Sequence, residues 1–168
     1  MSSASSVAQV VSALERRYPP ATAEDWDAVG LVCGDPAAAV RRILWAVDPA
    51  EAVVDQAIDL QVELLITHHP LFLTGVHSVA ATSAKGRVVH RLLGAGVSLY
   101  CAHTNADVAD PGVSDALAAT LGVRDTVPLV PGGGSAGLGR IGRLSEPTTL
   151  ADFADFVAGA LPATAHGA

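Results

Sequence analysis

Short apolar segments that alternate with amphipathic helical patterns constrain the fold of this chain more than any other feature. Residues 43–47, 64–67 and 97–102 are almost wholly apolar, which is typical of short strands in the middle of a sheet. Two stretches with helical spacing, around Val54 and Leu92, separate these segments. The order strand, helix, strand, helix, strand predicts an α/β fold with a mostly parallel sheet, right-handed crossovers and helices on both faces.

Further elements flank this central pattern. Helical spacing from Val7 to Leu14 predicts a first helix, and Thr149 predicts the cap of a last one. The glycine-rich residues 131–137 predict a flexible loop. The last helix has an apolar face, yet no strand follows it to complete a crossover. We therefore expect the fold to be truncated at the C-terminus.

The composition is typical of one globular domain. The chain has 168 residues, of which 50% are hydrophobic and 16% charged, so we expect a single domain over residues 1–168 with a flexible loop at 131–137. No segment approaches the ~18 consecutive apolar residues of a membrane span, and the N-terminus lacks a secretory signal. Cys33 and Cys101 are too few for a disulfide scaffold. These features predict a cytoplasmic protein without a membrane partner.

The charge balance disfavours nucleic acids as partners. The net charge is −7, and Lys85 is the only lysine. An acidic chain repels a phosphate backbone, whereas it is compatible with cations.

The adjacent histidines His68 and His69 are the clearest chemical signal. They follow the predicted strand 64–67, and ligands of open parallel sheets bind at the carboxyl ends of strands. Neighbouring side chains on a regular strand point to opposite faces, so the two can share a site only if the backbone turns there. Pro70 favours such a turn. On residue types alone, two interpretations remain open. The pair binds metal, or the two histidines are ordinary polar residues at a strand end.

His103 and Asp107 follow the third predicted strand and belong to the same candidate site. An imidazole and a carboxylate are a usual combination in dinuclear metal centres. The alternative for Asp107 is a loop residue that forms an Asx-turn. For Asp48, which follows the first strand, the pattern Asp48-Pro49 favours a helix N-cap over a ligand role.

Three motifs together resemble the Nif3-like family, whose members are also named dinuclear metal centre hexameric proteins or GTP cyclohydrolase I type 2 homologues. The motifs are W-D-A-V-G-L at 26–31, I-T-H-H-P-L at 66–71 and A-H-T-N-A-D at 102–107. Their order and spacing also match, and the resemblance covers nearly the whole chain. One departure is P-G-V-S-D at 111–115, where the family more often has G-G-V-N-D.

The resemblance implies a layered α/β fold, assembly into a homo-hexamer and two divalent metal ions per subunit. It implies that His68, His69 and Asp107 are metal ligands and that His103 lies beside the site. The family's further ligands, a His and a Glu, come from a C-terminal part that this sequence lacks, so the chain resembles an N-terminal portion. Imidazole and carboxylate ligands are compatible with Zn, Fe, Mn, Co or Ni.

Two hypotheses for function follow from these observations. The first is a metal-dependent hydrolase, related by its family to GTP cyclohydrolase, that acts on a small molecule or nucleotide with His103 as catalytic proton shuttle. The second is a non-catalytic metal-binding protein whose ring assembly serves a regulatory or interaction role. Turnover by the metal-loaded protein discriminates between them.

Overall fold

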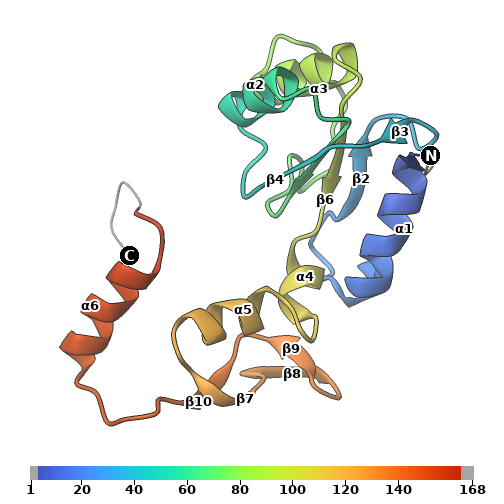
Figure 1. Ribbon diagram of the computed structural model, residues 1–168. Coiled ribbons are helices and arrows are strands. Elements are labelled where there is room, and N and C mark those ends of the chain that lie inside the picture. Colours follow the sequence, from blue (N-terminus) through green and yellow to red (C-terminus); the bar gives the residue numbers. More distant parts are fainter. Residues whose placement is uncertain (1–3, 164–168) are drawn as a thin grey trace. The chain divides into compact units, whose positions relative to one another are not determined.

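The computed structural model describes residues 4–163, which belong to two compact units, Met1–Ala106 and Asp107–Ala168 (Figure 1). Each unit is described by itself, and the expectation of one domain over 1–168 stays a prediction. The helices are α1 Val7–Arg17, η1 Pro20–Thr22, α2 Glu51–Asp59, α3 Ala84–Gly94, α4 Thr104–Val108, α5 Val113–Thr120 and α6 Leu150–Ala160. The strands are β1 Ser5–Ser6, β2 Gly30–Cys33, β3 Ala39–Val40, β4 Ile43–Ala46, β5 Leu64–Thr67, β6 Ser98–Cys101, β7 Arg124–Val127, β8 Val130–Gly133, β9 Ala136–Leu138 and β10 Ile141–Arg143.

The longest of these helices have 11 residues. None of the helices within residues 4–163 has the length and apolar character that a membrane crossing needs.

A four-stranded sheet in the order β2-β6-β5-β4 forms the centre of the first unit. Strand β5 pairs in parallel with β4 and β6, whereas β2 runs antiparallel to β6. The prediction of a mostly parallel sheet is therefore confirmed. Thr67 at the end of β5 lies opposite Ala46 of β4 and Cys101 of β6. The carboxyl ends of three strands consequently meet at one edge of the sheet.

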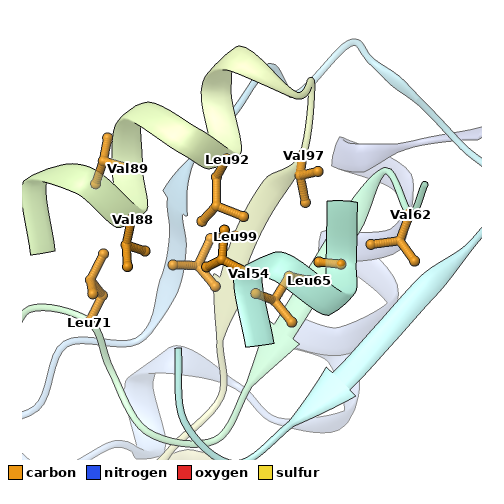
Figure 2. Close-up of a cluster of buried hydrophobic side chains, with 10 residues drawn as sticks. Val54, Val62, Leu65, Leu71, Val88, Val89, Leu92, Val97 and Leu99 are labelled. Atoms are coloured by element: carbon orange, nitrogen blue, oxygen red, sulfur yellow. The ribbon is translucent and has the colours of Figure 1, made fainter. Parts of the chain in front are cut away.

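Side-chain alternation along β5 and β6 divides the core into two layers. Leu65 and Leu99 point to the face that α2 and α3 cover (Figure 2). Leu64, Ile66 and Tyr100 point to the opposite face, where the apolar side of α1 packs. Because full burial of a leucine-sized side chain stabilises the folded state by about 1.5–3 kcal/mol, these layers hold the sheet and its edge in place. Helices on both faces, as predicted, make this an α/β fold.

The prediction that residues 43–47 form a strand buried on both faces is wrong. Strand β4 lies at the edge of the sheet, and Trp45 and Val47 are 59% and 58% exposed. Only the alternate residues, Leu44 and Ala46, pack against the core beneath α2 and α3. A continuous apolar run does not distinguish an edge strand from a central one, because the run says nothing of what covers each face.

The predicted N-cap at Asp48 is also wrong. Helix α2 begins at Glu51, and its N-cap is Ala50, which makes no side-chain capping bond. The carboxylate of Asp48 instead contacts His69 across the sheet edge. The cap predicted at Thr149 is confirmed, since its hydroxyl accepts a hydrogen bond from the amide of Asp152.

The second unit contains two antiparallel two-stranded sheets, β8-β9 and β10-β7, together with the helices α5 and α6. Residues 131–137, expected to be a flexible loop, contribute instead to β8 and β9, which form an antiparallel hairpin. The turn between these strands contains Gly134 with φ +60°, a conformation that glycine adopts without strain. Strand β7 pairs with β10, and none of the residues of α6 is buried.

Candidate metal centre

A bend directly after β5 brings the two adjacent histidines to one side. The amides of His68 and His69 donate to the carbonyls of Ala46 and Val47, at 3.1 and 2.8 Å. The hydroxyl of Thr67 donates to the carbonyl of His69 at 3.0 Å, which closes the bend. The two imidazole centroids are 5.1 Å apart. The turn that the sequence required for a shared site is therefore present.

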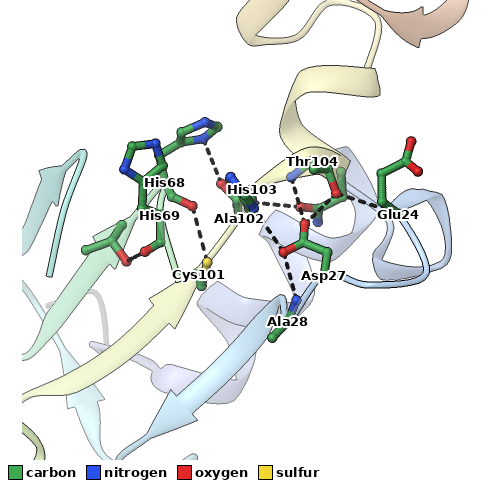
Figure 3. A network of polar contacts seen from close by, with 11 residues as sticks. Glu24, Asp27, Ala28, His68, His69, Cys101, Ala102, His103 and Thr104 are labelled. Atoms are coloured by element: carbon green, nitrogen blue, oxygen red, sulfur yellow. Dashed lines mark hydrogen bonds and ion pairs between the residues drawn. The ribbon is translucent and has the colours of Figure 1, made fainter. Parts of the chain in front are cut away.

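His103, two residues beyond the end of β6, completes a cluster of three imidazoles (Figure 3). Its ring centroid lies 5.0 Å from that of His68 and 5.6 Å from that of His69. One nitrogen from each of the three rings lies within 4.8 Å of the others. The structure thus groups His103 with the predicted ligands His68 and His69, whereas the family resemblance implied that it lies beside the site.

Each imidazole of the cluster is held through Nδ1 by an oxygen atom. The partner of His68 is the carbonyl of Ala102, at 3.1 Å. Those of His69 and His103 are the carboxylates of Asp48, at 2.7 Å, and Asp27, at 2.9 Å. A neutral imidazole that donates through Nδ1 has its lone pair on Nε2, which is the usual arrangement of metal-ligating histidines.

These residues fit a divalent metal ion. Zn–N bonds of about 2.0–2.1 Å require nitrogen separations of about 3.3 Å at a tetrahedral centre, so the rings need to approach by no more than about 1.5 Å. Imidazole nitrogen is a good ligand for zinc, copper, iron and nickel.

Asp27 is the most enclosed charged group of the cluster's surroundings. Its side chain has no exposed area, against 63% for that of Asp48. Burial raises the pKa of Asp27, but hydrogen bonds from Thr104, His103 and Ala28 outweigh burial and hold that pKa below its ordinary value. Asp27 is therefore an ionised acceptor at neutral pH.

Cys101 forms a hydrogen bond with the backbone at His68. Its thiol lies at the end of β6 and donates to the carbonyl of His68 at 3.2 Å. Burial, followed by the nearby carboxylate of Asp27, raises the pKa of Cys101 to about 12. A protonated, buried thiol is a structural group rather than a metal ligand.

Sequence reasoning missed the part played by two carboxylates. Asp48 follows β4 and Asp27 precedes β2, 21 and 76 residues from the histidines that they contact. Asp48 had a competing local explanation as a helix cap. The sequence signal that could have identified Asp27 is its position within W-D-A-V-G-L, one of the three motifs of the resemblance.

Asp107 lies in α4, four residues after His103 in the sequence, and is the first residue of the second unit. Within that unit, its backbone carbonyl accepts a hydrogen bond from the hydroxyl of Ser114 at 3.0 Å. Its role as a metal ligand stays a prediction.

The fold and the cluster together define an α/β protein with histidines gathered at the carboxyl edge of its sheet. A family model, Duf34/NIF3 (NGG1p interacting factor 3), matches residues 5–167. The chain belongs to this family, as the three motifs predicted.

A curated relative from Streptomyces coelicolor (strain ATCC BAA-471 / A3(2) / M145), named GTP cyclohydrolase 1 type 2 homolog, is 50% identical over 165 residues. The match covers 96% of this chain and 58% of the relative. This chain thus spans somewhat more than half the length of that protein.

Two solved structures resemble the chain closely. Hypothetical protein SA1388 of Staphylococcus aureus has a TM-score of 0.86 at 27% identity, covering 92% of this chain and 64% of that one. A Bacillus cereus protein related to NIF3 has a TM-score of 0.74 at 36% identity, covering 79% of this chain and 37% of that one. These neighbours support the α/β fold and the family membership.

Proposed function

We propose that this chain is a divalent-metal-binding protein and that its metal site serves a hydrolytic reaction. The observation that supports metal binding most strongly is the convergence of His68, His69 and His103, each held through Nδ1. Asp107 belongs to the same proposal as a carboxylate ligand, which a site for two ions would need. A bound divalent ion supplies a Lewis acid and a water of lowered pKa.

The residues of the chain would divide the remaining work. His68 is held by a backbone group, the carbonyl of Ala102 directly after β6, rather than by a side chain. His69 has the more exposed side chain, 47% against 17% for His103, and faces solvent from which a substrate arrives. His103, paired with Asp27, is suited either to coordinate or to carry a proton between water and substrate.

The names of the curated relatives make GTP the first substrate to test. Protein loaded with zinc or manganese should release product from GTP or from a panel of phosphoesters, and His69→Ala should abolish that activity. If the loaded protein binds its metal but converts none of these compounds, the hydrolase proposal fails while the metal site stands.

Assembly and location complete the proposal. Six copies in a ring, in the cytoplasm, are what the family resemblance implies. Light scattering coupled to gel filtration tests the assembly, and a mass other than that of six chains contradicts it.

A further inference from the structure

We propose that Asp27 is a positioning residue of the histidine cluster, which fixes His103 as the tautomer protonated on Nδ1. His103 then offers Nε2, and no other atom, to a metal ion. The inference rests on the proposed metal site and adds to it a residue that is not itself a candidate ligand. It also assigns a role to the segment Glu24–Ala28, which carries Asp27.

The hydrogen bonds around Asp27 leave one possible direction for the contact with His103. Its Oδ2 accepts from the amide of Thr104 at 3.0 Å and from the hydroxyl of the same residue. Its Oδ1 accepts from the amide of Ala28 at 2.7 Å and faces Nδ1 of His103 at 2.9 Å. A carboxylate with these donors acts only as an acceptor, so Nδ1 of His103 carries the hydrogen.

The hydroxyl of Thr104 has a fixed role in this network (Figure 3). It accepts a hydrogen bond from the amide of Glu24 at 3.0 Å, which leaves its own hydrogen for Asp27. The amide of His103 is held separately by the side chain of Asn105, at 2.9 Å. The start of α4 and the segment before β2 are therefore locked together around one carboxylate.

Packing restricts the His103 ring further. Trp26 meets it at a centroid distance of 5.9 Å and an interplanar angle of 79°. A ring held by a carboxylate on one nitrogen and by an indole at its side has little freedom to flip. Its orientation is consequently set before any metal arrives, which lowers the cost of forming the site.

The second carboxylate–histidine pair provides an internal comparison. Asp48 holds His69 with a similar distance, but its side chain is 63% exposed, so water competes for both partners. We therefore expect Asp27 to contribute more to the geometry of the cluster than Asp48.

The direct test is the tautomer of His103 in the metal-free protein. Long-range ¹H–¹⁵N spectra of the full 168-residue chain, labelled at histidine and held at about pH 8, where an ordinary imidazole is neutral, distinguish the two forms. The inference requires His103 to be protonated on Nδ1. A wild-type spectrum with the hydrogen on Nε2 overturns it, without any variant.

The matched variants are Asp27→Asn and Asp48→Asn, which change one carboxylate oxygen to an amide nitrogen. In Asp27→Asn, an amide nitrogen at the Oδ1 position donates to His103, and one at the Oδ2 position faces the amide of Thr104. Either orientation weakens the hold on Nδ1, so His103 should shift toward the Nε2-protonated tautomer. Zinc affinity measured by calorimetry should then fall by about 10–100-fold. Asp48→Asn should leave the His103 tautomer unchanged and weaken zinc binding less.

The outcomes separate this inference from the proposed function. If zinc does not bind but Asp27→Asn changes the His103 tautomer, the positioning role stands and the metal site fails. If zinc binds and a folded Asp27→Asn variant keeps both tautomer and affinity, the positioning role is wrong. Circular dichroism establishes folding, and should Asp27→Asn not fold, the wild-type tautomer decides.

Discussion

The carboxylate of Asp27 lies 2.9 Å from Nδ1 of His103, although 76 residues separate them in the chain. This contact links the segment before the antiparallel edge strand β2 to the loop after β6. It is the buried counterpart of the exposed pair between Asp48 and His69. Each carboxylate is thus paired with a different histidine of the cluster.

Zinc binding should weaken as the pH falls. An imidazole must be neutral, with Nε2 unprotonated, to coordinate a metal, so protons and zinc compete for Nε2. Calorimetric titrations at about pH 7.5 and about pH 5.5 should show a much lower affinity at the acidic pH. An affinity that is equal at both values would indicate ligands other than histidine.

Replacement of Gly86 should destabilise the first unit, although alanine favours helices by up to about 1 kcal/mol. Gly86 lies in the first turn of α3, and a Cβ there would come within 1.9 Å of the carbonyl oxygen of Ala80. Because backbone must move to relieve that overlap, Gly86→Ala should lower the melting temperature in a thermal scan. Gly94→Ala, at the other end of α3, meets nothing within 4 Å and is the matched control. Equal melting temperatures for the two variants would contradict this prediction, because they would show that the backbone at Ala80 moves aside at no cost in stability.

The second unit depends on an ion pair that should make it sensitive to acid. Arg140, whose side chain is 4% exposed, donates from Nη2 to Asp115 at 2.7 Å. Hydrogen bonding from Arg140 holds the pKa of Asp115 below its ordinary value, against a smaller opposing effect of burial. The pair therefore stabilises the fold above the unfolded-state pKa of about 3.9, and this stabilisation is lost as the pH falls through the lower folded-state pKa.

Asp115→Asn should therefore cost about 2–4 kcal/mol in the free energy of unfolding at neutral pH, because it leaves a buried guanidinium without its counter-ion. Between about pH 2 and 7, the free energy of unfolding measured with urea should also depend less on pH in this variant than in the wild type. Asp55→Asn removes an exposed pair with Arg91 and should change stability by about 1 kcal/mol or less. A loss at Asp115 no larger than that at Asp55 would contradict the account.

The sequence predicted the parts of the fold that local patterns determine. Hydrophobic patterns identified α1 and the strands 64–67 and 97–102. The alternation of strands and helices along the chain predicted the parallel pairing of β5. The strand predicted at residues 43–47 is present as β4, but its predicted burial on both faces was wrong, because the exposure of Trp45 depends on which strand lies at the edge. Local patterns also failed for residues 131–137, where glycine-rich composition suggested a loop although Gly134 provides the turn of a hairpin.

The sequence predicted which histidines belong to the site, but not the carboxylates that hold them. The adjacent pair His68 and His69 was identified, together with the bend that their shared site requires. His103 was placed in the same candidate site because it follows the third predicted strand. Its contact with both rings was not predicted, since the ends of β5 and β6 become neighbours only in the folded sheet. Asp27 and Asp48 were missed as partners of histidines because both contacts join residues far apart in the chain.

A zinc titration of the wild-type chain and of three single variants tests the central claim most directly. If His68, His69 and His103 form one metal site, wild-type protein binds zinc, and alanine at any of the three positions weakens binding by about ten-fold or more. His90→Ala, an exposed histidine of α3 outside the cluster, should leave the affinity unchanged. An absence of zinc binding by the wild-type chain, or an unchanged affinity in any one of the three cluster variants, would contradict the account.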